Sequence, residues 1–73
     1  MLCNVCRQHA QFERTVFHEA TPTKVRLCEP CAGKVELVDH MHRITEATDH
    51  ATKTAEVDSL LAAVERAKSE ASA

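Results

Sequence analysis

The sequence contains no tryptophan or tyrosine, and only two phenylalanines are present among its 73 residues. Proteins that hold single-stranded nucleic acid usually stack its bases on aromatic rings, so this scarcity disfavours such a ligand. The single glycine, Gly33, excludes the glycine-rich loop that cradles phosphate groups in many nucleotide-binding enzymes. The composition therefore disfavours both single-stranded nucleic acid and nucleotides as ligands.

Long apolar runs are absent as well. Nowhere do 18 apolar residues follow one another, so no membrane-spanning helix and no membrane association are expected. The opening Met-Leu-Cys-Asn-Val-Cys lacks the charged start and apolar stretch of a secretory signal. We therefore expect a cytoplasmic protein, in a reducing setting where free thiolates persist.

Large apolar side chains are few. Valine, isoleucine, leucine, methionine and phenylalanine together number 17, and much of the remaining apolar fraction is alanine, which buries little area. Burial of so small a set can hardly offset the conformational entropy that a chain of this length loses on folding. The sequence thus predicts a further source of folding free energy.

Four cysteines supply that source, since Cys3 and Cys6 form one Cys-x-x-Cys pair and Cys28 and Cys31 form another. Two intervening residues let one turn present both sulfurs to a single tetrahedral ion, and two such pairs complete its coordination shell. We predict one structural zinc ion per chain. In zinc-finger peptides the metal contributes on the order of 10 kcal/mol or more to folding.

Other interpretations of these cysteines stay open. A disulfide framework normally accompanies a secretory signal, and a redox dithiol needs only one Cys-x-x-Cys pair. His9 or His18 could replace a cysteine as a ligand, although four thiolates already satisfy zinc. A complete thiolate shell leaves no open coordination position, and the sequence indicates neither a nucleophile with its base nor a sizeable pocket. We therefore expect no enzymatic activity and no small-molecule substrate.

The segment between the two cysteine pairs has the pattern of a β-hairpin. Residues 10–18 are rich in β-forming side chains, residues 19–23 indicate a turn that includes Pro22, and residues 24–27 alternate polar with apolar. Val25 and Leu27 are expected to face inward with Phe12 and Val16. This hairpin would bring Cys28 beside Cys6.

A helix is expected to open at the second cysteine pair, because Pro30 suits a first helical turn and Glu29 places a negative charge there. Its apolar face would comprise Val35, Leu37, Val38, Met41 and Ile44. A first knuckle, a hairpin and a second knuckle that opens a helix make a small zinc-stabilised α+β fold of the treble-clef type. A plainer zinc ribbon is the alternative, and the zinc domain is expected to span residues 1–44.

Beyond Ile44, residues 45–54 predict a weak helix or linker, and residues 55–73 predict a second helix with a frayed end. Thr54 is a candidate N-cap for that helix. Its apolar stripe comprises Val57, Leu60, Leu61 and Val64. Left in water, this stripe would be an association site for a partner protein or a second copy of the chain. Folding back onto the first helix, as a helical hairpin, is the alternative.

Charge separates the two halves of the chain. Residues 1–34 carry five basic and three acidic side chains, whereas residues 35–73 carry four basic and eight acidic ones. Four thiolates around a divalent ion would cancel the positive balance of the first half. Phosphate backbones reward clustered lysine and arginine, so this distribution disfavours nucleic acid as a partner.

The cysteine segments, Met1 to Cys6 and Val-Arg-Leu-Cys-Glu-Pro-Cys-Ala over residues 25–32, resemble the amino-terminal zinc module of the McsA family. Those bacterial proteins are regulators that work with a protein-arginine kinase and the Clp protease system. More loosely, the chain is similar to the dimeric, adaptor-binding zinc domain of the ClpX unfoldase. The resemblance covers roughly residues 1–40 and implies a zinc-ligand role for Cys3, Cys6, Cys28 and Cys31.

The sequence as a whole thus predicts a bacterial, non-enzymatic zinc module that acts as an adaptor or regulator through a protein partner or as a homodimer. A nucleic-acid-binding zinc ribbon in transcription or replication is one alternative function, and a thiol redox protein is another. Salt-dependent DNA binding would favour the first alternative. Reversible disulfide formation without loss of metal would favour the second.

Overall fold

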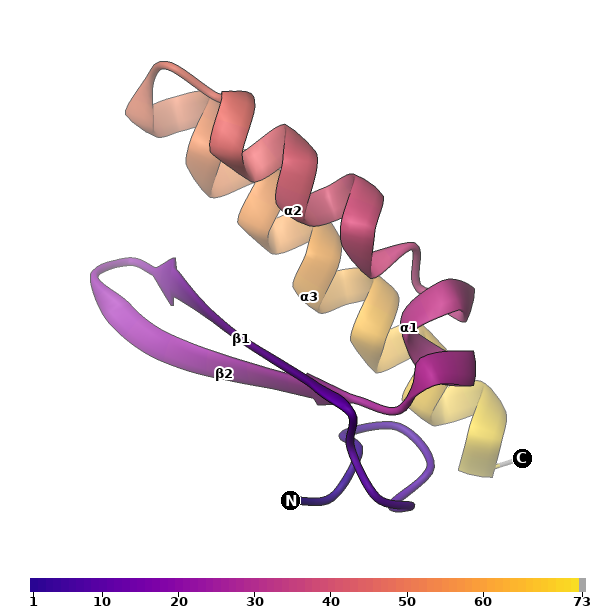
Figure 1. Cartoon of the computed structure of the whole chain (residues 1–73). Coiled ribbons are helices and arrows are strands. Elements are labelled where there is room, and N and C mark those ends of the chain that lie inside the picture. Colours follow the sequence, from indigo (N-terminus) through magenta and orange to yellow (C-terminus); the bar gives the residue numbers. More distant parts are fainter. Residues whose placement is uncertain (73) are drawn as a thin grey trace.

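A computed structural model describes residues 1–72 of the chain. It is a small α+β structure in which a two-stranded hairpin lies against a pair of helices and the amino-terminal turn lies at one end (Figure 1). The elements, in chain order, are β1 (Phe12–His18), β2 (Thr21–Leu27), α1 (Glu29–Lys34), α2 (Leu37–Glu46) and α3 (His50–Ser72). Among the described residues, no helix is long and apolar enough to cross a membrane.

The hairpin pairs β1 with β2 in antiparallel register, from Phe12 opposite Leu27 to His18 opposite Thr21. Only Glu19 and Ala20 form the turn, and both have a positive φ, at 52° and 67°. A positive φ at both central residues matches the right-handed twist of the flanking strands. The expected turn over residues 19–23 is therefore too long, and Pro22 lies in β2 opposite Phe17. Proline is tolerated at this place because it can leave its missing N–H on the edge of the sheet.

The inward face of the hairpin is as predicted. Val16, Val25 and Leu27 are buried, and Phe12 packs partly buried against the same cluster. Leu27 is the most completely covered of them, with 0% of its surface exposed. This residue precedes Cys28 directly, so the hairpin core anchors the second cysteine pair.

The helix expected from the second cysteine pair to Ile44 is wrong in one respect, because it is two helices. α1 ends at Lys34, and Glu36 adopts a left-handed conformation with φ 56° before α2 begins at Leu37. The break turns α2 relative to α1, so the helical spacing counted across it does not hold. Val38, expected on the buried face, is 77% exposed, while His40 takes a buried position in its place.

α3 begins earlier than the sequence suggested. The connection after α2 is short, and Asp49 accepts hydrogen bonds from the Thr52 backbone N–H at 3.0 Å and from the Thr52 hydroxyl at 2.7 Å. These bonds from Thr52 lower the pKa of the Asp49 carboxyl. Asp49 thus caps the helix, and the expected cap Thr54 lies inside it. Most of the stretch expected as a weak helix or linker, residues 45–54, is helical.

The apolar stripe of α3 belongs to the core and is not a free surface. Val57, Leu60 and Val64 are buried and Leu61 is partly buried, all in one cluster with the hairpin and the cysteines. α3 lies alongside α2 and also contacts β1 (Figure 1). The prediction of an association site at these four residues is therefore wrong. α3 instead folds back on its own chain, which was the alternative.

Two polar side-chain contacts at the surface join α3 to its neighbours. His18 Nε2 lies 2.6 Å from Asp58 Oδ1 at the tip of the hairpin, and Arg43 Nε lies 3.1 Å from Glu56 Oε2 across the two long helices. Exposed pairs of this kind contribute roughly 0–1 kcal/mol each. Apolar burial, rather than these pairs, holds α3 in place.

Candidate metal centre

The four cysteines come together at the end of the hairpin, where the amino-terminal turn meets α1. Their sulfur atoms all lie within 4.8 Å of one another, and no disulfide links them. Cys3, Cys28 and Cys31 are buried and Cys6 is partly buried. The sequence prediction that these four residues form one group is confirmed, and such a group can hold a metal ion.

The first cysteine pair lies in a tight turn that closes on itself. The Cys3 N–H donates to the Gln8 carbonyl at 2.7 Å, and the Arg7 N–H donates to the Cys3 carbonyl at 3.2 Å. Arg7 completes the turn in a left-handed conformation with φ 65°. The Val5 N–H donates to Cys3 Sγ at 3.4 Å. The positive end of this N–H dipole therefore faces the Cys3 sulfur, which is one of the four candidate metal ligands. The backbone therefore shapes this turn around sulfur.

The second pair is positioned by the start of α1. Cys28 is the N-cap residue of this helix and Cys31 lies in its first turn, with Pro30 between them. The Ala32 N–H donates to the Cys28 carbonyl at 2.8 Å and so begins the helical pattern. Proline costs nothing here because the first N–H groups of a helix have no intrahelical partner.

Asn4 ties the first pair to the second. Its backbone N–H donates to the Arg26 carbonyl at 2.7 Å, and its side-chain oxygen accepts from the Arg26 N–H at 2.5 Å. Gln11 adds a second connection, since its N–H donates to the Leu27 carbonyl and its side chain accepts from the Glu29 N–H, each at 3.0 Å. Sequence reasoning missed both residues, although an asparagine inside a knuckle is a recognisable turn signal.

The thiols differ in their readiness to ionise. Burial opposes ionisation of Cys3, but the backbone groups of Cys6, Cys28 and Val5 outweigh it and lower the pKa of Cys3 to about 6. Burial raises the pKa of Cys31, and the neighbouring thiols Cys28, Cys3 and Cys6 raise it further. Crowded thiols resist holding several negative charges at once. A divalent cation would remove that conflict by binding all four as thiolates.

The donor set fits zinc in particular. Four sulfur ligands from two Cys-x-x-Cys turns are the usual shell of a structural zinc site, whereas magnesium and calcium prefer oxygen. His9 and His18 are not part of the cluster. The backbone of His9 forms a bridge with Leu2, and the side chain of His18 pairs with Asp58.

Comparison of the chain with protein-family models, with curated proteins and with solved structures finds no match. The resemblance to the McsA and ClpX zinc modules therefore rests on the cysteine segments alone.

Proposed function

We propose that the chain is a zinc-stabilised protein-interaction module, with one zinc ion bound by Cys3, Cys6, Cys28 and Cys31. The observation that carries the metal assignment is the close group of four thiols, of which three lie in the core cluster and the fourth, Cys6, packs against it. Two knuckles joined by a hairpin, the second opening a helix, support a treble-clef assignment. The thiolate chemistry supports a reducing compartment such as the cytoplasm.

A non-enzymatic role follows from the same shell. Four thiolates fill the coordination sphere of zinc, so the ion would have no position for a reacting water or substrate. Metal chemistry would therefore serve the fold. An adaptor or regulatory role, as the resemblance to McsA implies, then depends on the surface of the module.

The surface that best supports a protein partner lies between β1 and the α1–α2 segment. Two adjoining hollows of about 340 and 160 Å³ share Phe12, Ala32, Leu37 and Val38 in their walls. We call these four residues the Val38 groove. Val38 is the most exposed large apolar side chain described, at 77%. An apolar side chain of a partner seated here would be removed from water together with it, which favours association.

Charge around the Val38 groove indicates what kind of segment it fits. Glu29, Glu36 and Asp39 line the larger hollow, and the basic Arg14 lines the smaller one. We therefore propose a partner segment with an apolar anchor flanked by lysine or arginine. A second copy of this chain is a poorer fit, because the chain itself carries a net charge of −2.

A displayed library of random peptides, selected on the zinc-loaded chain, tests this function. We expect enrichment of sequences with one or two large apolar residues beside lysine or arginine, and loss of their binding to Val38→Glu. Thr45→Glu is the matched control, since it adds the same charge to an exposed position of α2 outside both hollows.

Failure to enrich any sequence, or binding that Val38→Glu leaves unchanged, would refute the interaction surface. Sedimentation of the free chain as a dimer that Val38→Glu dissociates would make a second copy the occupant and would equally refute a basic partner segment.

A further inference from the structure

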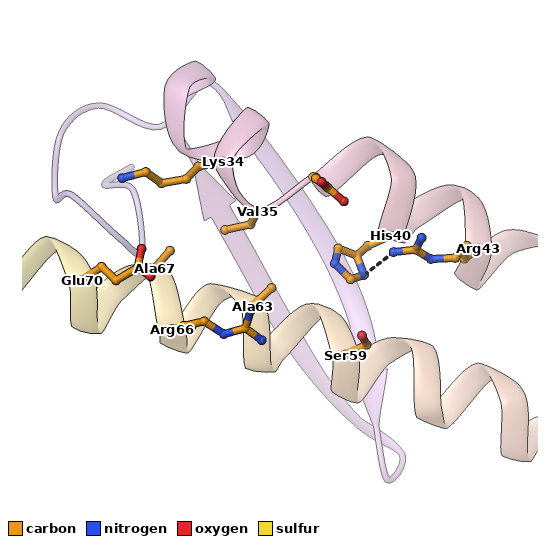
Figure 2. Close-up of a pocket in the computed structure, with 10 residues that line it drawn as sticks. Lys34, Val35, His40, Arg43, Ser59, Ala63, Arg66, Ala67 and Glu70 are labelled. Carbon is orange, nitrogen blue, oxygen red and sulfur yellow. Dashed lines mark hydrogen bonds between the residues drawn. The ribbon is translucent and has the colours of Figure 1, made fainter.

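A second, polar cleft lies on the other side of the α1–α2 connection, between that connection and α3 (Figure 2). Its volume is about 360 Å³, within the range of roughly 300–1,000 Å³ typical of small-molecule sites. Lys34, Glu36 and His40 line one wall, and Ser59, Arg66 and Glu70 line the other. The cleft includes none of the cysteines, and of its lining residues only Glu36 also lines the larger hollow at the Val38 groove.

Two of the residues that line this cleft are cations without an acidic partner among the described residues. Lys34 and Arg66 form no salt bridge with any described residue, although Glu36 and Glu70 line the same cleft. Arg43, by contrast, is held by Glu56 at 3.1 Å and donates through Nη2 to His40 Nδ1 at 3.2 Å. The cleft thus has one cation on each wall available to a ligand.

The contact with Arg43 also determines which ring nitrogen of neutral His40 carries the proton. A guanidinium group only donates hydrogen bonds, so Nδ1 must be the accepting, unprotonated nitrogen of the ring. The neutral imidazole then carries its proton on Nε2. Burial and the nearby charge of Arg43 lower the pKa of His40, which favours this neutral form. The second ring nitrogen lies on the side away from Arg43, towards the cleft (Figure 2), so His40 presents an N–H donor there.

We propose that this cleft binds a small phosphate monoester that also carries hydroxyl groups, such as a polyol phosphate. The phosphate would accept from the Arg66 guanidinium and the His40 Nε2–H, and the Lys34 ammonium, which points away from both in Figure 2, would reach it by rotation of its side chain. A phosphate group has the charge for two cations and acceptor oxygens that point in several directions, whereas the two oxygens of a carboxylate lie in one plane. Glu36 and Glu70 would accept from the hydroxyl groups.

The same two carboxylates argue against a nucleic-acid strand as the ligand. A polyanion binds where lysine and arginine form an extended track, and its further phosphates would here meet Glu36 and Glu70. The proposal is therefore a single phosphate on a small molecule. It uses no cysteine of the metal centre and shares only Glu36 with the hollows of the interaction surface.

The test is a titration of the zinc-loaded, isotope-labelled full chain with glycerol 3-phosphate, followed by backbone amide shifts at constant ionic strength. We expect saturable shifts centred on Lys34, Val35, Ala63 and Arg66. Arg66→Ala and Lys34→Ala should each weaken binding about tenfold or more. Lys53→Ala, which removes an exposed lysine of α3 outside the cleft, is the matched control and should bind like the unaltered chain.

Inorganic phosphate and a short single-stranded oligonucleotide are the comparison ligands. Weaker binding of inorganic phosphate supports the proposal, because it lacks the hydroxyl groups that Glu36 and Glu70 would hold, whereas equal or tighter binding would overturn the assignment of a hydroxyl-bearing ligand. Absence of saturable shifts with glycerol 3-phosphate, equal weakening by Lys53→Ala, or tighter binding of the oligonucleotide would each overturn it. Unchanged amide spectra away from the cleft and unchanged zinc content show that each variant is folded.

Discussion

Four non-glycine residues in the described part of the chain have a positive φ: Arg7, Glu19, Ala20 and Glu36. The left-handed region costs an L-residue roughly 1–2 kcal/mol, and glycine is its usual occupant. Arg7 closes the first cysteine turn and Glu36 separates α1 from α2, so both strained positions border a proposed site. Neither side chain gives a sequence signal for this conformation, which explains why the helix break was not predicted.

Arg7→Gly should therefore stabilise the zinc-loaded chain. Glycine relieves the strained φ but adds freedom to the unfolded chain, so we expect a net gain of up to about 1 kcal/mol in the free energy of unfolding. Denaturant unfolding measures it. Arg14→Gly, at an ordinary strand position of β1, is the control and should lower stability. Equal losses in both variants would show that the φ of Arg7 carries no strain.

His40 should make stability depend on pH. Burial, followed by the charge of Arg43, lowers its pKa in the fold, against an opposing effect of Glu56, Glu36 and Asp39. Below its ordinary pKa of about 6.5 the unfolded chain takes up a proton that the folded chain resists. Stability is therefore fully present above that pH and falls as the pH drops towards the lowered value.

His40→Asn keeps a side-chain acceptor but removes this titration. We expect it to cost stability at about pH 7.5, and the difference from the unaltered chain should narrow towards about pH 5.5. Urea unfolding at each pH, with zinc content measured in parallel, gives the comparison. A difference that stays constant over this range would mean that His40 titrates alike in the folded and unfolded chains.

At the scale of elements, α3 supplies the residues that complete the core. Leu60 is 0% exposed and belongs to the same cluster as Leu27 and the cysteines. Leu60→Ala should lower the free energy of unfolding by about 2–5 kcal/mol, because the cavity is left deep in a small core. Val38→Ala is the matched control on α2 and should stay within about 0.5 kcal/mol, since Val38 is largely in water. A loss for Leu60→Ala no larger than for Val38→Ala would place the α3 stripe outside the core.

The elements were predictable to different degrees for physical reasons. The strand pattern around Val25 and the apolar stripe of α3 were visible, because alternation and 3.6-residue spacing record which face is buried. The direction in which α3 docks was not, since a stripe of valine and leucine fits a partner as well as its own chain. Pro22 was taken as a turn signal, but the edge of a two-stranded sheet accepts it. The cysteine group was predictable because ligand spacing is set by the metal.

At the scale of the whole molecule, the two halves are expected to depend differently on metal. The hairpin has few buried apolar residues of its own and is fastened at one end by the cysteine group, so we expect it to lose its structure when zinc is removed. Chelation, or Cys28→Ser, should collapse the amide spectrum of residues 10–27. Glu29→Ser, an exposed neighbour outside the ligand set, should leave it unchanged. Native shifts after complete chelation would contradict metal-dependent folding.

The central claim is that one zinc ion occupies the four-cysteine group, and its most direct test combines metal content with X-ray absorption on the purified chain. We predict one zinc per chain with four sulfur neighbours at about 2.3 Å and no nitrogen. A chain that is folded without zinc, a ratio near two, or a nitrogen neighbour from a histidine such as His9 would contradict this assignment.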